Sequence, residues 1–293
     1  MLINNEWTDY EIIATGNGEK LERWSKYHLI RPDPQIIWKP LSPLRKIADI
    51  SAVYEKNDGS SDASWKFYTT VPDDFTVGWR SLRFKLRLTN FKHTGLFPEQ
   101  AANWARMIDL ITSARAANPE RTVNVLNLFA YTGGATLACL SAGASVTHLD
   151  GARAMVERAS ENAYLSGLGA APCRYIIDDC MKFVVREIKR GKKYDAIIMD
   201  PPSFGRGPNG EVWKLETNLF DLVCATASIL GDDPLFYLIN SYTTGLQPSV
   251  MTNIIARGLR RKGEFIADEI GLPTREKGII LPAGASAWLT FTK

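Results

Sequence analysis

Glycines and carboxylates recur at the ends of apolar runs in the second half of the chain, and together they could bind a nucleoside. The positions are Tyr131-Thr132-Gly133-Gly134, Asp150, Asp178-Asp179 and Asp200-Pro201-Pro202. A glycine turn lets the backbone approach a ligand at a helix N-terminus, and a carboxylate accepts hydrogen bonds from hydroxyl or amino groups. The glycines match neither the GxGxxG fingerprint nor the GxxxxGK[ST] phosphate loop. The turn alone is therefore a weak indication of a cofactor site.

Two of the carboxylates have positions suited to a nucleoside. Asp150 follows Gly133 by 17 residues, close to the separation of a carboxylate that accepts both hydroxyls of a ribose. Asp179 could accept from an adenine amino group, with the backbone N–H of Cys180 reaching a ring nitrogen. The alternative for both aspartates is a cap on the helix that follows.

The sequence Asp200-Pro201-Pro202-Ser203-Phe204 follows the apolar run 196–199. Prolines lack an N–H and stiffen the backbone, so their carbonyls can point at a ligand. The Asp200 carboxylate and these carbonyls could accept hydrogen bonds from an –NH₂ group, while Phe204 offers a face to a planar base. The alternative is a rigid loop that ends a strand.

From Arg121 onward, strand and helix patterns alternate, which predicts a parallel sheet with helices on both faces. In such sheets ligands bind outside the carboxyl ends of the strands, where all of these motifs fall. Strands are expected at 123–129, 146–150, 175–178, 195–200, 235–240, 264–268 and 286–292. Helices are expected at 101–117, 135–142, 152–166, 181–190, 218–230 and 248–261.

Residues 1–95 show short β-like segments and no long amphipathic helix, which indicates a small β-rich module. In the segment 80–88, apolar residues alternate with Arg83, Lys85 and Arg87. Cations at every second position of a strand share one face, where they could contact RNA phosphates. The alternative is a solvated edge strand whose charges oppose aggregation.

Composition excludes several other classes. The chain has 293 residues, four cysteines without a CxxC pair and three histidines, so neither a structural metal site nor a disulfide framework is expected. No run approaches a membrane span, and the start MLINNEWTDYEII lacks a signal-peptide layout, so a cytoplasmic location is expected. The net charge of +3 neither requires nor excludes a nucleic-acid partner.

The segments NVLNLFAYTGGATLACLSAGA, IIDDC, YDAIIMDPPSF and HTGLFPEQ together resemble class I S-adenosylmethionine-dependent methyltransferases, in the subgroup related to large-subunit ribosomal RNA methyltransferases. The resemblance covers about residues 90–293. It implies a Rossmann-like, seven-stranded, mostly parallel sheet whose last strand is antiparallel. The change of pattern along the chain predicts domains at 1–95 and 96–293. The resemblance also implies S-adenosyl-L-methionine as cofactor, with ligands Phe97, Gln100, Asn127, Phe129, Tyr131, Thr132, Gly133, Gly134, Asp150, Asp179 and Cys180. It places the substrate beside Asp200, Pro201, Pro202 and Phe204.

The chain departs from this subgroup after the fifth strand of the sheet. Relatives that methylate C5 of cytosine carry a nucleophilic cysteine there, whereas this chain reads Asn240-Ser241-Tyr242-Thr243. Without a thiolate the base cannot be activated covalently. The expectation is therefore methyl transfer to a base nitrogen, with ribosomal RNA as substrate by analogy. The alternatives are a methyltransferase acting on a protein or small molecule, and a non-catalytic RNA-binding protein.

Overall fold

The computed structural model describes residues 1–56, 62–89 and 92–292. The chain forms two compact units. One comprises Met1–Leu2, Ala102–Ile270 and Ala283–Lys293, and the other Ile3–Ala101 and Gly271–Pro282. They are called the C-terminal and N-terminal units below.

A seven-stranded sheet forms the centre of the C-terminal unit, with the strand order β10-β9-β8-β11-β14-β16-β15. Neighbouring strands from β10 to β14 run parallel, and β16 runs antiparallel to β14. The predicted sheet and its antiparallel last strand are confirmed. The chain builds β9 and β10 on one side of β8 and then places β11 on the other side. The switch point, where ligands bind in such folds, therefore lies between β8 and β11.

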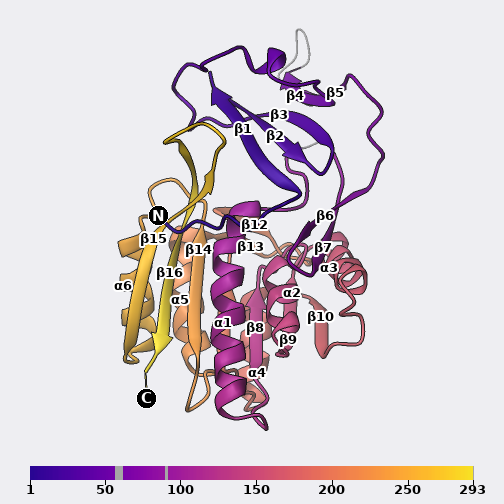
Figure 1. Ribbon diagram of the computed structural model, residues 1–293. Helices are drawn as coiled ribbons and strands as arrows, with labels where there is room; N and C mark the ends of the chain where they lie inside the picture. The colour runs from indigo at the N-terminus through magenta and orange to yellow at the C-terminus, as the bar shows by residue number, and fades with distance from the viewer. Residues whose placement is uncertain (57–61, 90–91, 293) are drawn as a thin grey trace. The chain divides into compact units, whose positions relative to one another are not determined.

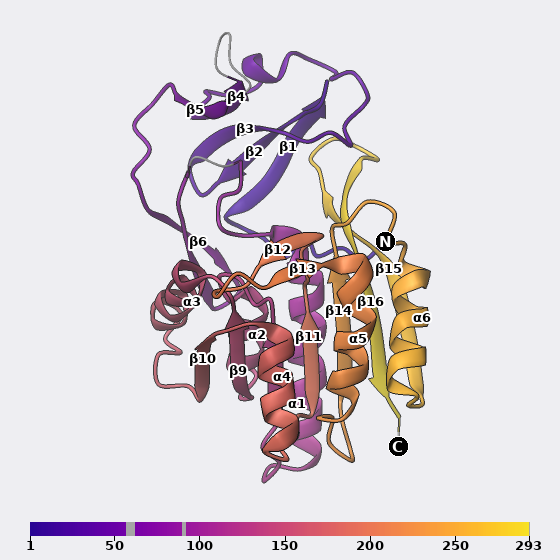
Figure 2. The ribbon, with the colours of Figure 1, turned by 180° about the vertical axis from the view of Figure 1, so that it is seen from behind.

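Helices cover both faces of this sheet, with α1, α2 and α3 on the face toward the viewer in Figure 1 and α4, α5 and α6 on the opposite face (Figure 2). The second face packs against a continuous apolar core that includes Phe183, Leu222, Tyr237 and Ile255. The strands are β8 (Asn124–Leu128), β9 (Ser145–Asp150), β10 (Cys173–Ile177), β11 (Ala196–Met199), β14 (Phe236–Ser241), β15 (Gly263–Pro273) and β16 (Ile280–Phe291). The helices are α1 (Ala101–Ala117), α2 (Gly134–Ser141), α3 (Arg153–Leu165), α4 (Cys180–Lys189), α5 (Leu215–Ala227) and α6 (Pro248–Leu259).

The segment between β11 and α5 differs from the prediction. A polar loop was expected, and a short antiparallel hairpin is present, formed by β12 (Phe204–Arg206) and β13 (Val212–Lys214). Helix α5 then begins at Leu215 rather than at Asn218. The carboxamide oxygen of Asn218 accepts the backbone N–H of Lys214 at 2.7 Å, so Asn218 stabilises the first turn from inside the helix.

The N-terminal unit contains a five-stranded sheet of order β1-β2-β3-β4-β5 and a separate hairpin, β6–β7 (Figure 1). The strands are β1 (Tyr10–Gly16), β2 (Glu19–Trp24), β3 (Tyr27–Pro32), β4 (Ala52–Lys56), β5 (Ala63–Phe67), β6 (Phe75–Trp79) and β7 (Leu82–Leu86). Two 3₁₀ turns, η1 (Leu44–Lys46) and η2 (Pro98–Gln100), complete it. The predicted β-rich character is confirmed, although β2, β4 and β6 were not predicted.

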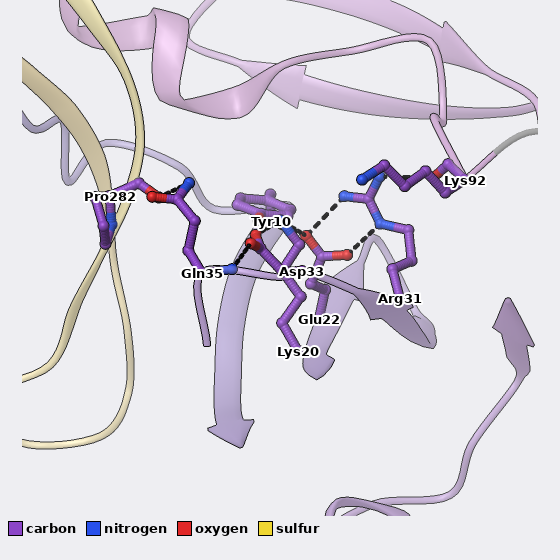
Figure 3. Close-up of polar contacts among 8 residues, drawn as sticks. All are labelled: Tyr10, Lys20, Glu22, Arg31, Asp33, Gln35, Lys92 and Pro282. Carbon is purple, nitrogen blue, oxygen red and sulfur yellow. Dashed lines mark hydrogen bonds and ion pairs between the residues drawn. The ribbon is translucent and has the colours of Figure 1, made fainter. Parts of the chain in front are cut away.

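A buried ion pair lies at the centre of the five-stranded sheet (Figure 3). The Glu22 side chain is fully buried, and Arg31 donates to both of its carboxylate oxygens, at 2.6 and 2.8 Å. Tyr10 donates its hydroxyl to Glu22 at 2.8 Å, and Arg31 also donates to the backbone carbonyl of Lys92. Burial opposes ionisation of Glu22, but the charges of Arg31 and Lys20 outweigh it and lower the pKa of Glu22 to about 2. The cluster is thus a satisfied structural ion pair.

The first segment of the N-terminal unit ends at Ala101, whereas the predicted boundary follows residue 95. Residues 271–282, from the ends of β15 and β16 and their connection, also belong to the N-terminal unit. There Thr274 pairs with Ile12, and Gln35 donates to the carbonyl of Pro282 at 3.2 Å (Figure 3). The domain assignment at 1–95 and 96–293 stays a prediction. Across the described residues, every helix is too short or too polar to span a bilayer.

Candidate active site

The glycine turn after β8 has an unusual backbone. Phe129, Tyr131 and Gly133 all adopt positive φ angles, of 55°, 50° and 88°. Such strained residues cluster at functional sites, because the rest of the fold must hold them in place. Gly133 is required by its φ and by Ala159, whose Cβ would lie 2.9 Å from an added Cβ. An added Cβ at Gly134 would lie 2.4 Å from the Trp104 ring, so packing against α1 explains that glycine.

Asp150, at the end of β9, links the turn to the next helix. One carboxylate oxygen accepts the backbone N–H of Tyr131 at 2.9 Å, and the other accepts that of Ala152 at 2.9 Å. Burial raises the pKa of Asp150, although hydrogen bonds from Ala152, Tyr131 and Gly151 oppose the rise. Ala152 is the N-cap of α3 and no side chain caps this helix, so Asp150 supports the residue before α3 and the capping alternative is not confirmed. A carboxylate has about four acceptor positions, so ribose hydroxyls can also be accepted.

A buried polar chain supports the turn from below. The amide nitrogen of Asn127 donates to the Thr136 hydroxyl at 3.0 Å, and this hydroxyl lies 2.9 Å from Nδ1 of His148. Burial lowers the pKa of His148 to about 3, so the ring is neutral. The Thr136 hydroxyl therefore connects Asn127 in β8 with His148 in β9. Asn127 thus holds the first turn of α2, and a direct contact with the cofactor stays a prediction.

Asp179 and Cys180 begin helix α4. The Asp179 carboxylate accepts the backbone N–H of Lys182 at 2.9 Å, which is an N-cap, and Asp178 pairs with Arg186. Burial raises the pKa of the Cys180 thiol, and the Phe129 backbone, which opposes this rise, joins Cys180 to the glycine turn. Cys180 is therefore a neutral, buried thiol rather than a nucleophile. The adenine contacts predicted for Asp179 and the Cys180 backbone remain predictions.

The Asp200-Pro201-Pro202 loop after β11 is held from two sides. Asn240, in β14, donates its amide nitrogen to the Asp200 carboxylate at 2.9 Å. Trp213, in β13, donates its indole N–H to the Pro202 carbonyl at 2.7 Å. The side chain of Phe204 is 56% exposed, so it can meet a ligand from outside. The Pro202 carbonyl is thus hydrogen-bonded within the protein, so its role is structural, whereas the Pro201 carbonyl is the one predicted to contact the substrate.

The hairpin β12–β13 joins the loop to the glycine turn, and sequence reasoning missed it. The Trp213 ring lies 4.8 Å from the Phe129 ring between centroids, and Glu211 pairs with Lys182 at the start of α4. Figure 2 shows the hairpin at the end of the sheet where β11 stops. The turn-forming residues Gly207-Pro208-Asn209-Gly210 are the sequence signal that could have revealed this hairpin. The predicted sites from four strands therefore lie at one edge of the sheet.

The remaining predicted residues lie in the N-terminal unit. Phe97 precedes η2, Gln100 ends it and is 9% exposed, and their closure over a cofactor stays a prediction. Lys85 in β7 and Arg87 just after it both pair with Asp74, at 3.1 and 2.7 Å. Arg83, also in β7, donates to the Arg80 and Leu82 carbonyls. Asp74, just before β6, therefore compensates part of the basic face. Within the described ranges, no group of three or more His, Cys, Asp or Glu could hold a metal ion.

Known methyltransferases resemble this chain in sequence and structure. Residues 57–217 match the family model for S-adenosylmethionine-dependent methyltransferases. A ribosomal RNA large subunit methyltransferase K/L of Shewanella frigidimarina is 35% identical over 151 residues, 51% of this chain and 20% of the relative. A ribosomal RNA large subunit methyltransferase I of Tolumonas auensis is 28% identical over 174 residues, 56% of this chain and 42% of the relative. The chain thus spans less than half the length of these curated relatives.

A solved structure, of the S-adenosylmethionine-dependent methyltransferase from Agrobacterium tumefaciens, agrees over nearly the whole chain. It has a TM-score of 0.91 and 33% identity, and the match covers 99% of this chain and 93% of that one. The predicted fold class is confirmed by this match. The family model and this structure agree on the same cofactor-dependent enzyme class. The chain therefore belongs to the S-adenosylmethionine-dependent methyltransferase family.

Proposed function

We propose that the protein transfers a methyl group from S-adenosylmethionine to an amino nitrogen of a base in RNA, with ribosomal RNA as the substrate. The carrying observation is the Asp200 carboxylate, held by Asn240 at the end of β11 beside the exposed Phe204. The curated relatives named above act on ribosomal RNA according to their names, which supports the substrate class.

The residues at the sheet edge fit the cofactor of this family. Asp150 is a mostly buried carboxylate fixed by two backbone N–H groups beside the glycine turn, so it is oriented to accept ribose hydroxyls. Gly133 and Tyr131, with their positive φ angles, would surround the methionine part together with Thr132. When bound, S-adenosylmethionine supplies an electrophilic methyl group on a sulfonium.

The composition of the strand end next to Asp200 favours nitrogen as the methyl acceptor. Strand β14 ends with Asn240 and Ser241, both buried, and no thiol is present there. Carbon-5 methylation by covalent activation needs a thiolate that adds to the base ring. An amino nitrogen needs no such activation, because its lone pair is directed once its N–H groups are held.

Asp200 and the Pro201 carbonyl are the groups that would hold the amino group. Both are acceptors, so both N–H bonds of an –NH₂ group can be engaged and the nitrogen lone pair directed to the methyl group. Phe204 would stack on a single-stranded or extruded base. The proton lost by the methylated nitrogen passes to solvent. Pro202 contributes through its rigidity and through the bond of its carbonyl to Trp213.

RNA would contact the basic face formed by Arg83, Lys85 and Arg87. The Arg83 and Arg87 side chains are exposed and Lys85 is half-buried. The phosphates would compete with Asp74 for Lys85 and Arg87, since these pairs are partly exposed to solvent and therefore weak.

The test is transfer of a labelled methyl group to ribosomal subunits and total RNA by the wild type, Asp200→Ala and Asp195→Ala. Asp195 precedes β11 while Asp200 follows it, so the two variants remove a carboxylate from opposite ends of one strand. Transfer to RNA that falls at least about a hundredfold in Asp200→Ala, and much less in Asp195→Ala, supports the proposal. Label found only in protein or small molecules, or an active Asp200→Ala, contradicts it.

A further inference from the structure

A buried chain of hydrogen bonds runs from Trp288 to Asp200 across three elements of the C-terminal unit. The Trp288 indole N–H donates to the carboxamide oxygen of Asn103 at 3.0 Å, and the Asn103 amide nitrogen donates to the Ser286 hydroxyl at 2.9 Å. Ser286 donates to the carboxamide oxygen of Asn240 at 2.8 Å, and the Asn240 amide nitrogen donates to Asp200 at 2.9 Å. The chain thus joins β16, α1 and β14 to the loop after β11.

The four side chains that lead to Asp200 in this hydrogen-bond chain lie in the core and not on the surface. Trp288 and Ser286 are 0% exposed, and Asn103 and Asn240 are 1% exposed. A buried polar group left without a partner costs far more than a satisfied one gains, so such a chain is retained only when its members are mutually satisfied. Three polar side chains in succession beneath one carboxylate are more than the packing of β14 against β16 requires, because apolar residues could fill that space.

The direction of the hydrogen bonds is fixed from both ends of this chain. An indole N–H can only donate, so the Asn103 oxygen must face Trp288 and the Asn103 nitrogen must face Ser286. The Asp200 carboxylate accepts from the Asn240 nitrogen, so the Asn240 oxygen faces Ser286. The Ser286 oxygen accepts from Asn103 and donates its proton to the Asn240 oxygen. This order settles which way both asparagine amides point, which atomic positions alone do not.

We infer that Asn103, Ser286 and Asn240 are positioning residues that fix the Asp200 carboxylate as a hydrogen-bond acceptor for the substrate. The inference rests on the function proposed above and deepens it. The Asn240 donor fixes the position of one Asp200 oxygen. The substrate group recognised there must therefore be a hydrogen-bond donor, a requirement that an exocyclic amino group meets. A flipped Asn240 would place its oxygen against the carboxylate and destroy this preference.

The kinetic test uses Ser286→Ala, which removes one hydroxyl from the middle of the chain and leaves Asp200 intact. The expected result is a kcat reduced about fivefold, with KM for RNA and Kd for S-adenosylhomocysteine unchanged. In an Asp200→Ala background, Ser286→Ala is expected to cause no further loss, because both changes act through one carboxylate. The control is Thr226→Val, which removes a buried hydroxyl bonded to Tyr237 at 2.7 Å in the same unit. An equal kcat loss in the control, or multiplying losses in the double variant, overturns the inference.

A second measurement needs no substrate and so separates this inference from the proposed function. The indole proton of Trp288, assigned by its loss in Trp288→Phe, is observed by NMR in ¹⁵N-tryptophan-labelled protein. Asp200→Ala is expected to shift this signal through the chain, whereas Asp195→Ala leaves it in place. A Trp288 signal that does not respond to Asp200→Ala overturns the inference even if RNA is methylated. If the Trp288 signal responds but the protein methylates no RNA, the hydrogen-bond link from Trp288 to Asp200 is supported and only the proposed RNA substrate is wrong.

Discussion

The indole nitrogen of Trp213 lies 2.7 Å from the carbonyl oxygen of Pro202, and the same indole ring packs against Phe129. One side chain thus links the glycine turn after β8 to the Asp-Pro-Pro loop after β11. These are the two strand ends that flank the switch point of the sheet. The relative placement of the predicted cofactor and substrate sites therefore depends on a hairpin between them.

Replacing Trp213 tests this link. Trp213→Phe keeps an aromatic ring near Phe129 and removes the donor to Pro202, so kcat is expected to fall about fivefold with cofactor affinity unchanged. Trp213→Ala removes both interactions and is expected to weaken S-adenosylhomocysteine binding as well. Steady-state methyl transfer and calorimetry measure the two effects. Equal kcat for Trp213→Phe and wild type would show that the Pro202 carbonyl needs no support.

Asp150 is expected to control cofactor affinity and its pH dependence. Asp150→Asn replaces a charged acceptor, so Kd for S-adenosylhomocysteine is expected to rise about tenfold. Burial raises the pKa of Asp150, so the ionised acceptor is lost at a higher pH than for an ordinary aspartate. Affinity should therefore fall as the pH is lowered, and calorimetry should show this fall in the wild type but not in Asp150→Asn. Glu157→Gln, at an exposed position on α3, serves as the control. An equal change of Kd in this variant would contradict the role of Asp150 as a cofactor ligand.

Asp74 is expected to limit RNA binding through the basic face of β7. Asp74→Asn releases Lys85 and Arg87 from their ion pairs, so RNA affinity should rise. The slope of log Kd against log salt should steepen by about one to two, since up to two more phosphates can be neutralised. Asp73→Asn, an exposed neighbour, provides the matched change of net charge. If both variants behave alike, the face acts through net charge and the ion pairs do not restrain it.

Glu22 is expected to stabilise the N-terminal unit in a pH-dependent way. Its pKa is lowered from 4.5 to about 2, so its contribution is complete above about pH 4.5 and is lost as the pH falls toward 2. The shift corresponds to about 3 kcal/mol, and Glu22→Gln should lower the free energy of unfolding by about this amount at pH 7. Hydrogen exchange of β2 and β3 amides measures it, with Glu19→Gln on the same strand as control. A loss that is equally large at pH 3 would contradict the ionic origin.

The alternation of apolar runs and helical patterns predicted the sheet of the C-terminal unit, because its central parallel strands β8, β11 and β14 are buried on both faces. The pattern of β2 was harder to recognise, since Glu22 occupies an inward position where an apolar residue is expected. Its charge is compensated by Arg31 on the neighbouring strand, a pairing that local periodicity does not encode.

The sequence predicted those site residues whose role can be recognised from their own type and their spacing to a motif. The aspartates at the strand ends were found from their spacing, and the cap that Asp179 provides for α4 was anticipated as an alternative. Trp213 was missed because its role depends on Phe129, which lies far from it in sequence, and on a hairpin that was not predicted. Asn103 and Ser286 were missed for the same reason, since 183 positions separate two side chains that share a hydrogen bond.

The most direct test of methyl transfer to an amino nitrogen is mass spectrometry of nucleosides from RNA lacking this modification, after incubation with the protein and methyl-labelled S-adenosylmethionine. The account predicts one labelled nucleoside whose methyl group is on an exocyclic nitrogen, and its loss with Asp200→Ala. A methyl group on carbon 5 of a pyrimidine, or one that persists in Asp200→Ala, would contradict it.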